Sequence, residues 1–179
     1  MQDNIVIKEL KSSTTQEKAF KALVEKYKER LYWHIRRIVL DHDDADDVLQ
    51  NTFIKVYRNI QSFKEDSAIY TWMYRIATNE ALSFLQKRAK FYDISNEELQ
   101  QKMVENLKAD SYFDGDEIQL KLQEAIATLP EKQRIVFNMK YFEELKYEDM
   151  SSILETSVGA LKASYHHAVK KIETQLTKL

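Results

Sequence analysis

A row of side chains suited to single-stranded nucleic acid recurs at three- and four-residue spacing in the first half of the chain. An aromatic ring stacks on an unpaired base, a guanidinium meets a phosphate, and an amide bonds a base edge. Residues at this spacing share one face of a helix. The alternative interpretation is that the tryptophan is an ordinary core aromatic. The row consists of Trp72, Arg75, Asn79, Ser83 and Gln86.

The segment just before this row is a short polar loop. In "SFKEDSA" (62–68) the helical periodicity stops at Phe63, Lys64, Ser67 and Ala68. A loop of this length is able to close over an unstacked base. Loop and helix together are therefore the first candidate site.

Neither a catalytic nor a metal-binding constellation is evident. The aspartates of "DHDDADD" (41–47) suit the first turn of a helix, whose dipole and free N–H groups they complement, and they lack calcium-loop spacing. His166 and His167 would lie about 100° apart around a helix, unlike the i, i+4 pair of helical zinc sites. The chain has no cysteine. We therefore expect no cofactor, no metal, no small-molecule substrate and no enzymatic activity.

The elements that position these residues are all expected to be helices. Two glycines and one proline supply little of the turn chemistry that many strands need. Apolar residues recur at helical spacing over 14–40, 44–60 and 69–90, and again from about residue 118. The prediction is an all-α fold. No apolar run approaches 18 residues, so we expect a cytoplasmic protein without membrane insertion.

Charge divides the 179-residue chain into three parts, although its net charge is only −2. Residues 1–90 have a balance of +3, residues 91–117 of −6, and residues 118–179 of +1. The middle part also has weak periodicity. The prediction is two small helical domains, 1–92 and 118–179, joined by a flexible acidic linker over 93–117.

Two helices near the carboxyl end form a helix-turn-helix pattern. "KYEDMSSIL" is joined by "ETS" to "SVGALKASYHHAVKK", and Ser157 is a good N-cap for the second helix. The turn often contains glycine, and Glu155 stands there, so we expect other residues to make the turn. Helix pairs with short connections also occur in purely structural bundles. The pattern alone therefore leaves DNA binding and a structural role open.

Taken together, the two domains resemble the extracytoplasmic-function (ECF) sigma factors, small bacterial proteins that direct RNA polymerase to promoters. The resemblance covers about residues 14–175. It rests on "ADDVLQNTFIKVYRNIQSF", "YTWMYRIATNEALSFL" and "LPEKQRIVFNMKYFEELKYEDMSSILETSVGALKASYHHA" in this order. It implies core RNA polymerase, promoter DNA and an anti-sigma factor as partners. The alternative is a helix-turn-helix regulator or helical adaptor that does not act through polymerase.

The resemblance also assigns functional residues to three sets. The minus-ten set, a pocket for single-stranded DNA, is Phe63, Lys64, Ser67, Ala68, Tyr70, Trp72, Arg75 and Asn79. The polymerase-binding set is Asp47, Gln50, Asn51 and Ile54. The minus-thirty-five set, on the recognition helix, is Ser157, Gly159, Lys162, Ser164, His166, His167 and Lys170. Family members often carry arginine where Lys162, Ser164 and His167 stand, so we expect different base contacts there.

Overall fold

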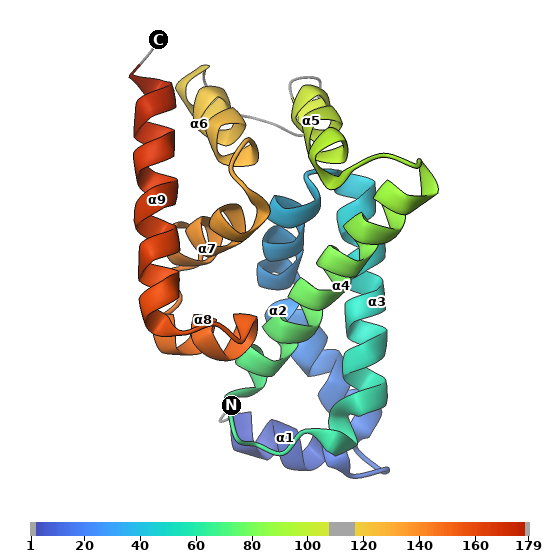
Figure 1. Cartoon of the computed structure of the whole chain (residues 1–179). Helices are drawn as coiled ribbons and strands as arrows, with labels where there is room; N and C mark the ends of the chain where they lie inside the picture. The colour runs from blue at the N-terminus through green and yellow to red at the C-terminus, as the bar shows by residue number, and fades with distance from the viewer. Residues whose placement is uncertain (1–2, 108–116, 178–179) are drawn as a thin grey trace.

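The computed structural model describes residues 3–107 and 117–177, and within these ranges every regular element is a helix (Figure 1). The all-α prediction is confirmed. In the described residues, no helix is long and apolar enough to cross a membrane. The elements are α1 (Asp3–Lys11), α2 (Gln16–Val39), α3 (His42–Asn59), the 3₁₀ turn η1 (Ile60–Ser62), α4 (Ile69–Phe91), α5 (Asn96–Leu107), α6 (Glu117–Ala127), α7 (Glu131–Tyr141), α8 (Tyr147–Leu154) and α9 (Val158–Leu176).

Helices α2, α3 and α4 form the bundle of the amino-terminal domain. Each helix turns an apolar stripe inward, and Leu31, Val48 and Met73 at its centre are at most 1% exposed. The Asp41 side chain caps α3 by accepting a hydrogen bond from the Asp44 N–H over 3.0 Å. These are the three helices that periodicity predicts, with ends that differ by two residues or fewer.

Helix α1 has no counterpart among the predicted elements. It lies across the end of the bundle, beside α2 and η1 (Figure 1). Ile7 and Leu10 are buried in the same core as the bundle residues. A helix of nine residues gives periodicity too little length to be distinguished from a loop.

The carboxyl-terminal domain packs α6, α7 and α8 against the long helix α9. Leu161, Ala168 and Ile172 are the buried residues of α9. In the turn between α8 and α9, Glu155 itself adopts the left-handed conformation, with φ 51° and ψ 40°. The expectation that other residues would make this turn is wrong: a carboxylate residue takes the place of the usual glycine, although the conformation is costly for a residue with a Cβ.

Part of the predicted linker is a helix. Helix α5 lies between α4 and α6, and its residues Leu99 and Met103 are buried (Figure 1). The Gln100 amide donates to the carbonyl of Ala127 (2.6 Å), the last residue of α6, and to that of Leu129 (2.7 Å), just beyond the helix. Residues 96–107 therefore differ from the flexible segment that sequence predicts, while residues 108–116 of that linker lie outside the described residues.

Candidate nucleic-acid interface

A cavity of about 390 Å³ lies between the 62–68 loop and the first turns of α4. Five of the eight minus-ten residues line it: Phe63, Lys64, Ser67, Trp72 and Arg75. Ser62, Asp66, Thr71 and Ser152 complete the lining. The structure thus brings together the loop and the helix that sequence singles out, and it adds Ser152 from α8 of the other domain.

The cavity is shaped by two aromatic residues whose rings are in contact at an interplanar angle of 38°. Phe63 is 4% exposed, and its ring centroid lies 5.1 Å from that of Trp72. Trp72 is half-buried, so it is neither a fully covered core residue nor a free surface ring. Ala68, in extended conformation, is the N-cap of α4 and accepts a hydrogen bond from the Trp72 N–H over 3.2 Å. The rigid start of α4 therefore fixes the ring at the cavity wall.

Three residues of the minus-ten set lie apart from the lining of this cavity. Ala68 is exposed at the helix start, and Asn79 is exposed about one turn beyond Arg75. Tyr70 lines a different cavity, of about 430 Å³, together with Arg30 and Asp149. Burial raises the pKa of Tyr70, and a hydrogen bond with Asp149 raises it further.

Arg75 connects the cavity to the helix-turn-helix. Its Nη2 donates to the Ser152 carbonyl of α8, and its Nη1 lies 3.5 Å from the Glu155 carboxylate. In this arrangement α8 covers one side of the candidate DNA pocket. Sequence separates Arg75 from Ser152 by 77 residues and gives no signal for the contact.

The recognition helix presents its predicted DNA-facing residues to solvent. Lys162, His166, His167 and Lys170 are exposed, and Ser164 is half-buried. At the helix start, the Ser157 hydroxyl accepts a hydrogen bond from the Ala160 N–H over 3.3 Å. A Cβ added at Gly159 would meet nothing within 4 Å, so the first turn is open to an approaching backbone. One face of α9 is thus packed and the other free, as in a groove-binding helix.

A second open surface is an apolar groove of about 750 Å³ between α2 and α3. Gln50 and Ile54 of the polymerase-binding set line it, whereas Asp47 and Asn51 are exposed outside it. Ile54 is 41% exposed, which is unusual for a large aliphatic residue. Contiguous exposed apolar surface of this kind marks protein interaction sites. The rest of its lining is Glu17, Phe20, Lys21, Val24, Phe53, Tyr57 and Arg58.

Sequence reasoning missed this groove because it assigned part of its wall to the core. Phe20, Val24, Phe53 and Tyr57 continue the helical stripe, yet they are half-buried or exposed. The Phe20 and Tyr57 ring centroids lie 4.9 Å apart in an edge-on contact. Periodicity predicts which face of a helix is apolar, but it does not show where a neighbouring helix leaves that face uncovered.

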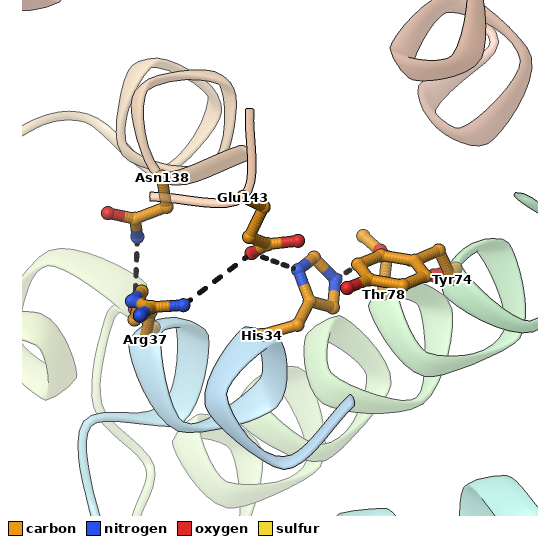
Figure 2. A network of polar contacts seen from close by, with 6 residues as sticks. All are labelled: His34, Arg37, Tyr74, Thr78, Asn138 and Glu143. Atoms are coloured by element: carbon orange, nitrogen blue, oxygen red, sulfur yellow. Dashed lines mark hydrogen bonds and ion pairs between the residues drawn. The ribbon is translucent and has the colours of Figure 1, made fainter. Parts of the chain in front are cut away.

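A buried polar network joins the two domains where α2 and α4 meet the segment after α7 (Figure 2). His34 Nδ1 lies 3.0 Å from Glu143 Oε1, and its Nε2 lies 2.8 Å from the Thr78 hydroxyl. Arg37 Nη1 lies 3.8 Å from the same Glu143 oxygen. The Asn138 amide adds a 3.4 Å hydrogen bond to the Arg37 carbonyl. We call His34, Arg37, Thr78, Asn138 and Glu143 the interdomain network.

The proton arrangement of this network follows from its hydrogen bonds. The Thr78 hydroxyl donates to the Tyr74 carbonyl over 2.7 Å, so its oxygen accepts from His34 Nε2–H. Burial, reinforced by the Glu143 charge, raises the pKa of Tyr74 above its ordinary value. Burial lowers the pKa of Arg37, and Glu143 opposes that shift.

Arg134 makes a second bridge between the domains. Its side chain is 2% exposed and donates to the Ala127 carbonyl over 3.2 Å and the Ile38 carbonyl over 3.4 Å. These carbonyls belong to the last turns of α6 and α2, where helical acceptors lack intrahelical partners. Burial lowers the pKa of Arg134, and the nearby Glu131 charge partly opposes the shift. One guanidinium thus ties together helix ends from both domains.

These surfaces are built for binding. They comprise an aromatic and cationic pocket, an apolar groove and a helix-turn-helix with an exposed basic face. Over residues 3–107 and 117–177, no group of three or more His, Cys, Asp or Glu side chains is placed to hold a metal ion. The fold defines a two-domain helical protein with a helix-turn-helix in its carboxyl-terminal domain.

Comparison with known proteins places this class more narrowly. The Sigma-70 region 2 family matches residues 23–91, and the Sigma-70 region 4 family matches residues 119–172. The RNA polymerase sigma-H factor of Pseudomonas aeruginosa is 32% identical, over 90% of this chain and 88% of its own length. The ECF RNA polymerase sigma factor SigW of Bacillus subtilis is 31% identical, over 90% of each chain. The chain therefore belongs to the ECF RNA polymerase sigma factors, which are transcription initiation factors.

Two solved structures share the fold. The sigma factor RpoE of Bartonella quintana, in complex with the anti-sigma factor NepR, matches with a TM-score of 0.70 and 21% identity, over 89% of this chain and 98% of that one. CnrH, in complex with the cytosolic domain of CnrY, matches with a TM-score of 0.72 and 19% identity, over 98% and 97%. Both matches extend over the two domains.

Proposed function

We propose that this sigma factor divides promoter recognition among the three surfaces described above. The cavity beside α4 holds an unpaired base of the minus-ten element, α9 reads the minus-thirty-five element, and the α2–α3 groove docks on core RNA polymerase. The observation that carries the proposal is the cavity itself, because it gathers loop and helix residues that suit single-stranded DNA. The protein acts as a binding factor in the cytoplasm, not as an enzyme.

Opening of the minus-ten element is driven by binding energy. Extruding a base costs a few kcal/mol, and stacking a base on an aromatic ring returns about 1–3 kcal/mol. Trp72 supplies the ring at the cavity wall, while Arg75 supplies a charge for the backbone. Lys64 and Ser67 line the other side from the loop. Pocket contacts of this kind offset the cost of strand separation.

Recognition of the minus-thirty-five element falls to the exposed face of α9. Lys162, Ser164, His166 and His167 are placed to meet base edges, and Lys170 to meet a phosphate. The open first turn at Ser157 and Gly159 lets a phosphate approach the helix N-terminus. Because this face has no arginine for bidentate contact with guanine, binding of the isolated domain to duplex DNA is weak, and polymerase provides the tether.

Docking on polymerase uses the apolar groove with its polar rim. Ile54 and the half-buried aromatic rings give the contact its apolar centre, and Asp47, Gln50 and Asn51 give it orientation. The partner surface is accordingly apolar with a basic edge. The basic edge would face the acidic and polar residues on α3.

An anti-sigma factor is the expected regulatory partner. The structural neighbours RpoE and CnrH were each solved with a bound partner, named as an anti-sigma factor for RpoE. In this chain α8 already covers one side of the minus-ten cavity through Arg75. A partner that holds the domains together would keep Arg75 bonded to α8 and that side covered.

Reconstitution tests the proposal directly. The full chain is mixed with bacterial core RNA polymerase and fragmented genomic DNA, and the 5′ ends of the transcripts are sequenced. We expect start sites that share two upstream elements and that vanish without the protein. Failure to bind core polymerase, or binding without promoter-specific starts, would refute it and favour a regulator acting without polymerase.

A further inference from the structure

We propose that Lys11, the last residue of α1, is a positioning residue that sets how strictly the minus-ten pocket selects its base. The inference rests on the proposed role of the 62–68 loop in minus-ten recognition. It concerns an element that neither of the two matched family regions covers, since the region 2 match begins at residue 23. Four observations carry it.

The Lys11 ammonium holds the loop at two points. Its Nζ donates to the Phe63 carbonyl over 2.8 Å and to the Glu65 carboxylate over 2.9 Å. The same Nζ lies 5.8 Å from the centroid of the Phe63 ring. One cation thus fixes both the backbone and a side chain of the first loop turn.

Lys11 is itself held in place from the other side. The Gln61 amide of η1, the turn that leads into the loop, donates to the Lys11 carbonyl over 3.3 Å. Ile7 and Leu10 anchor α1 in the core at 4% and 0% exposure. The side chain therefore projects from a fixed support, which is what a positioning group requires.

The loop needs such support because it has few contacts of its own. Lys64 through Ala68 are exposed, and Glu65 has a φ of 62°, in the left-handed region that disfavours a residue with a Cβ. The Phe63 ring contacts the Trp72 ring, with 5.1 Å between the two centroids. A shift of the Phe63 backbone would therefore move the Trp72 ring, which is proposed to stack on DNA.

The geometry favours positioning over a direct phosphate contact. The Lys11 side chain is 29% exposed, and its ammonium already has a carbonyl and a carboxylate as partners. A phosphate would have to displace the Glu65 carboxylate. The two roles differ in outcome, because a phosphate contact strengthens binding to all sequences alike, whereas a shaped pocket discriminates between them.

The test uses holoenzyme made from the full chain and bacterial core polymerase. The probe is a fork-junction DNA library whose single-stranded minus-ten segment is randomised. Bound DNA is sequenced for wild type and for Lys11→Met, which keeps the aliphatic stem and removes the donors. Lys8→Met is the matched control, because Lys8 is exposed on the same helix and carries the same charge. Lys11→Arg tests rescue, and thermal unfolding of each variant is recorded.

We expect Lys11→Met to reduce the preference for the selected sequence over random sequence about tenfold, the effect of losing about 1.4 kcal/mol of hydrogen bonding. Lys8→Met should leave the preference unchanged, and Lys11→Arg should restore it. If Lys11→Met fails to fold, Glu65→Gln removes the charged half of the contact and should show a smaller loss of preference in the same direction.

Two results would overturn the inference while leaving the proposed function intact. One is an unchanged sequence preference in Lys11→Met or, where that variant does not fold, in Glu65→Gln. The other is a uniform loss of affinity for all sequences with a salt dependence that is shallower by about one charge, which indicates a phosphate contact. Failure of the wild-type holoenzyme to select any sequence would instead refute the proposed function, and the inference with it.

Discussion

Replacement of Glu143 by glutamine should loosen the packing between the two domains. Glu143 is the acceptor shared by His34 and Arg37 in the interdomain network, and its side chain is 6% exposed (Figure 2). Glutamine has nearly the same shape but no charge. The substitution therefore keeps the volume and shape of the side chain and removes only the electrostatic part of the contact.

The expected size of the effect follows from the burial of the three groups. Breaking a fully buried ion pair costs about 3–5 kcal/mol. Here the Arg37 side chain is 23% exposed and recovers some solvation, and the amide oxygen of glutamine still accepts a hydrogen bond from His34. We therefore expect about 2 kcal/mol, which corresponds to about a thirtyfold shift from packed to separated domains.

Fluorescence energy transfer between the domains measures this shift. The chain has no cysteine, so Lys18→Cys on α2 and Lys171→Cys on α9 give two unique labelling sites on exposed positions. Single-molecule populations are compared at a urea concentration where wild type shows both states. Glu144→Gln is the matched control, because Glu144 is the next residue in sequence, is exposed and takes no part in the network.

Equal populations for Glu143→Gln and Glu144→Gln would refute the reasoning. That result would mean that apolar contacts and Arg134 hold the domains together without the carboxylate. A shift in both variants would equally count against a specific role, because it would trace the effect to net charge.

Three further predictions concern the other surfaces. Trp72→Ala should reduce promoter opening about tenfold or more, because it removes a stacking ring; permanganate reactivity of unpaired thymines measures this. Ile54→Asp should weaken binding to core polymerase about tenfold or more, because it puts an unpaired charge at the centre of an apolar contact; fluorescence anisotropy measures this. Met103→Ala should lower the free energy of unfolding by about 2 kcal/mol, since Met103 is 7% exposed on the buried face of α5; urea denaturation measures this.

Each of these predictions has a control within the chain. Phe91→Ala removes an aromatic ring that is 82% exposed at the far end of α4, and it should not affect opening. Ile118→Asp makes the same change as Ile54→Asp at a position that is 74% exposed outside the groove. Gln101→Ala alters an exposed residue of α5. If a control variant has the same effect as its test variant, the corresponding prediction is wrong.

The helices of both domains follow directly from the sequence because their cores depend on local periodicity. Val48 and Met73 bury the stripes that spacing predicts, and Ser157 caps α9 as its side chain suggests. The loop between η1 and α4 follows from the sequence as well, because the helical periodicity breaks at 62–68. Local signals of this kind need no knowledge of the partner helix.

Contacts that join distant segments had no such signal. His34 looks like one more residue of a long amphipathic helix, and only the fold brings Glu143, 109 positions later, to its ring. The same holds for Arg75 and Ser152. Helix α5 was obscured for a different reason: its acidic composition suggests solvation, yet Leu99 and Met103, four residues apart, suffice to dock it.

The contact of Arg75 with α8 has a thermodynamic consequence. A guanidinium bonded to the Ser152 carbonyl is not free to meet a phosphate, so DNA and the protein's own backbone are competing ligands for one side chain. If Arg75 binds promoter DNA as proposed, the measured dissociation constant is the intrinsic one divided by the fraction of molecules in which α8 has moved away. A substitution far from DNA that changes domain packing by about 1.4 kcal/mol then changes apparent promoter affinity as much as tenfold.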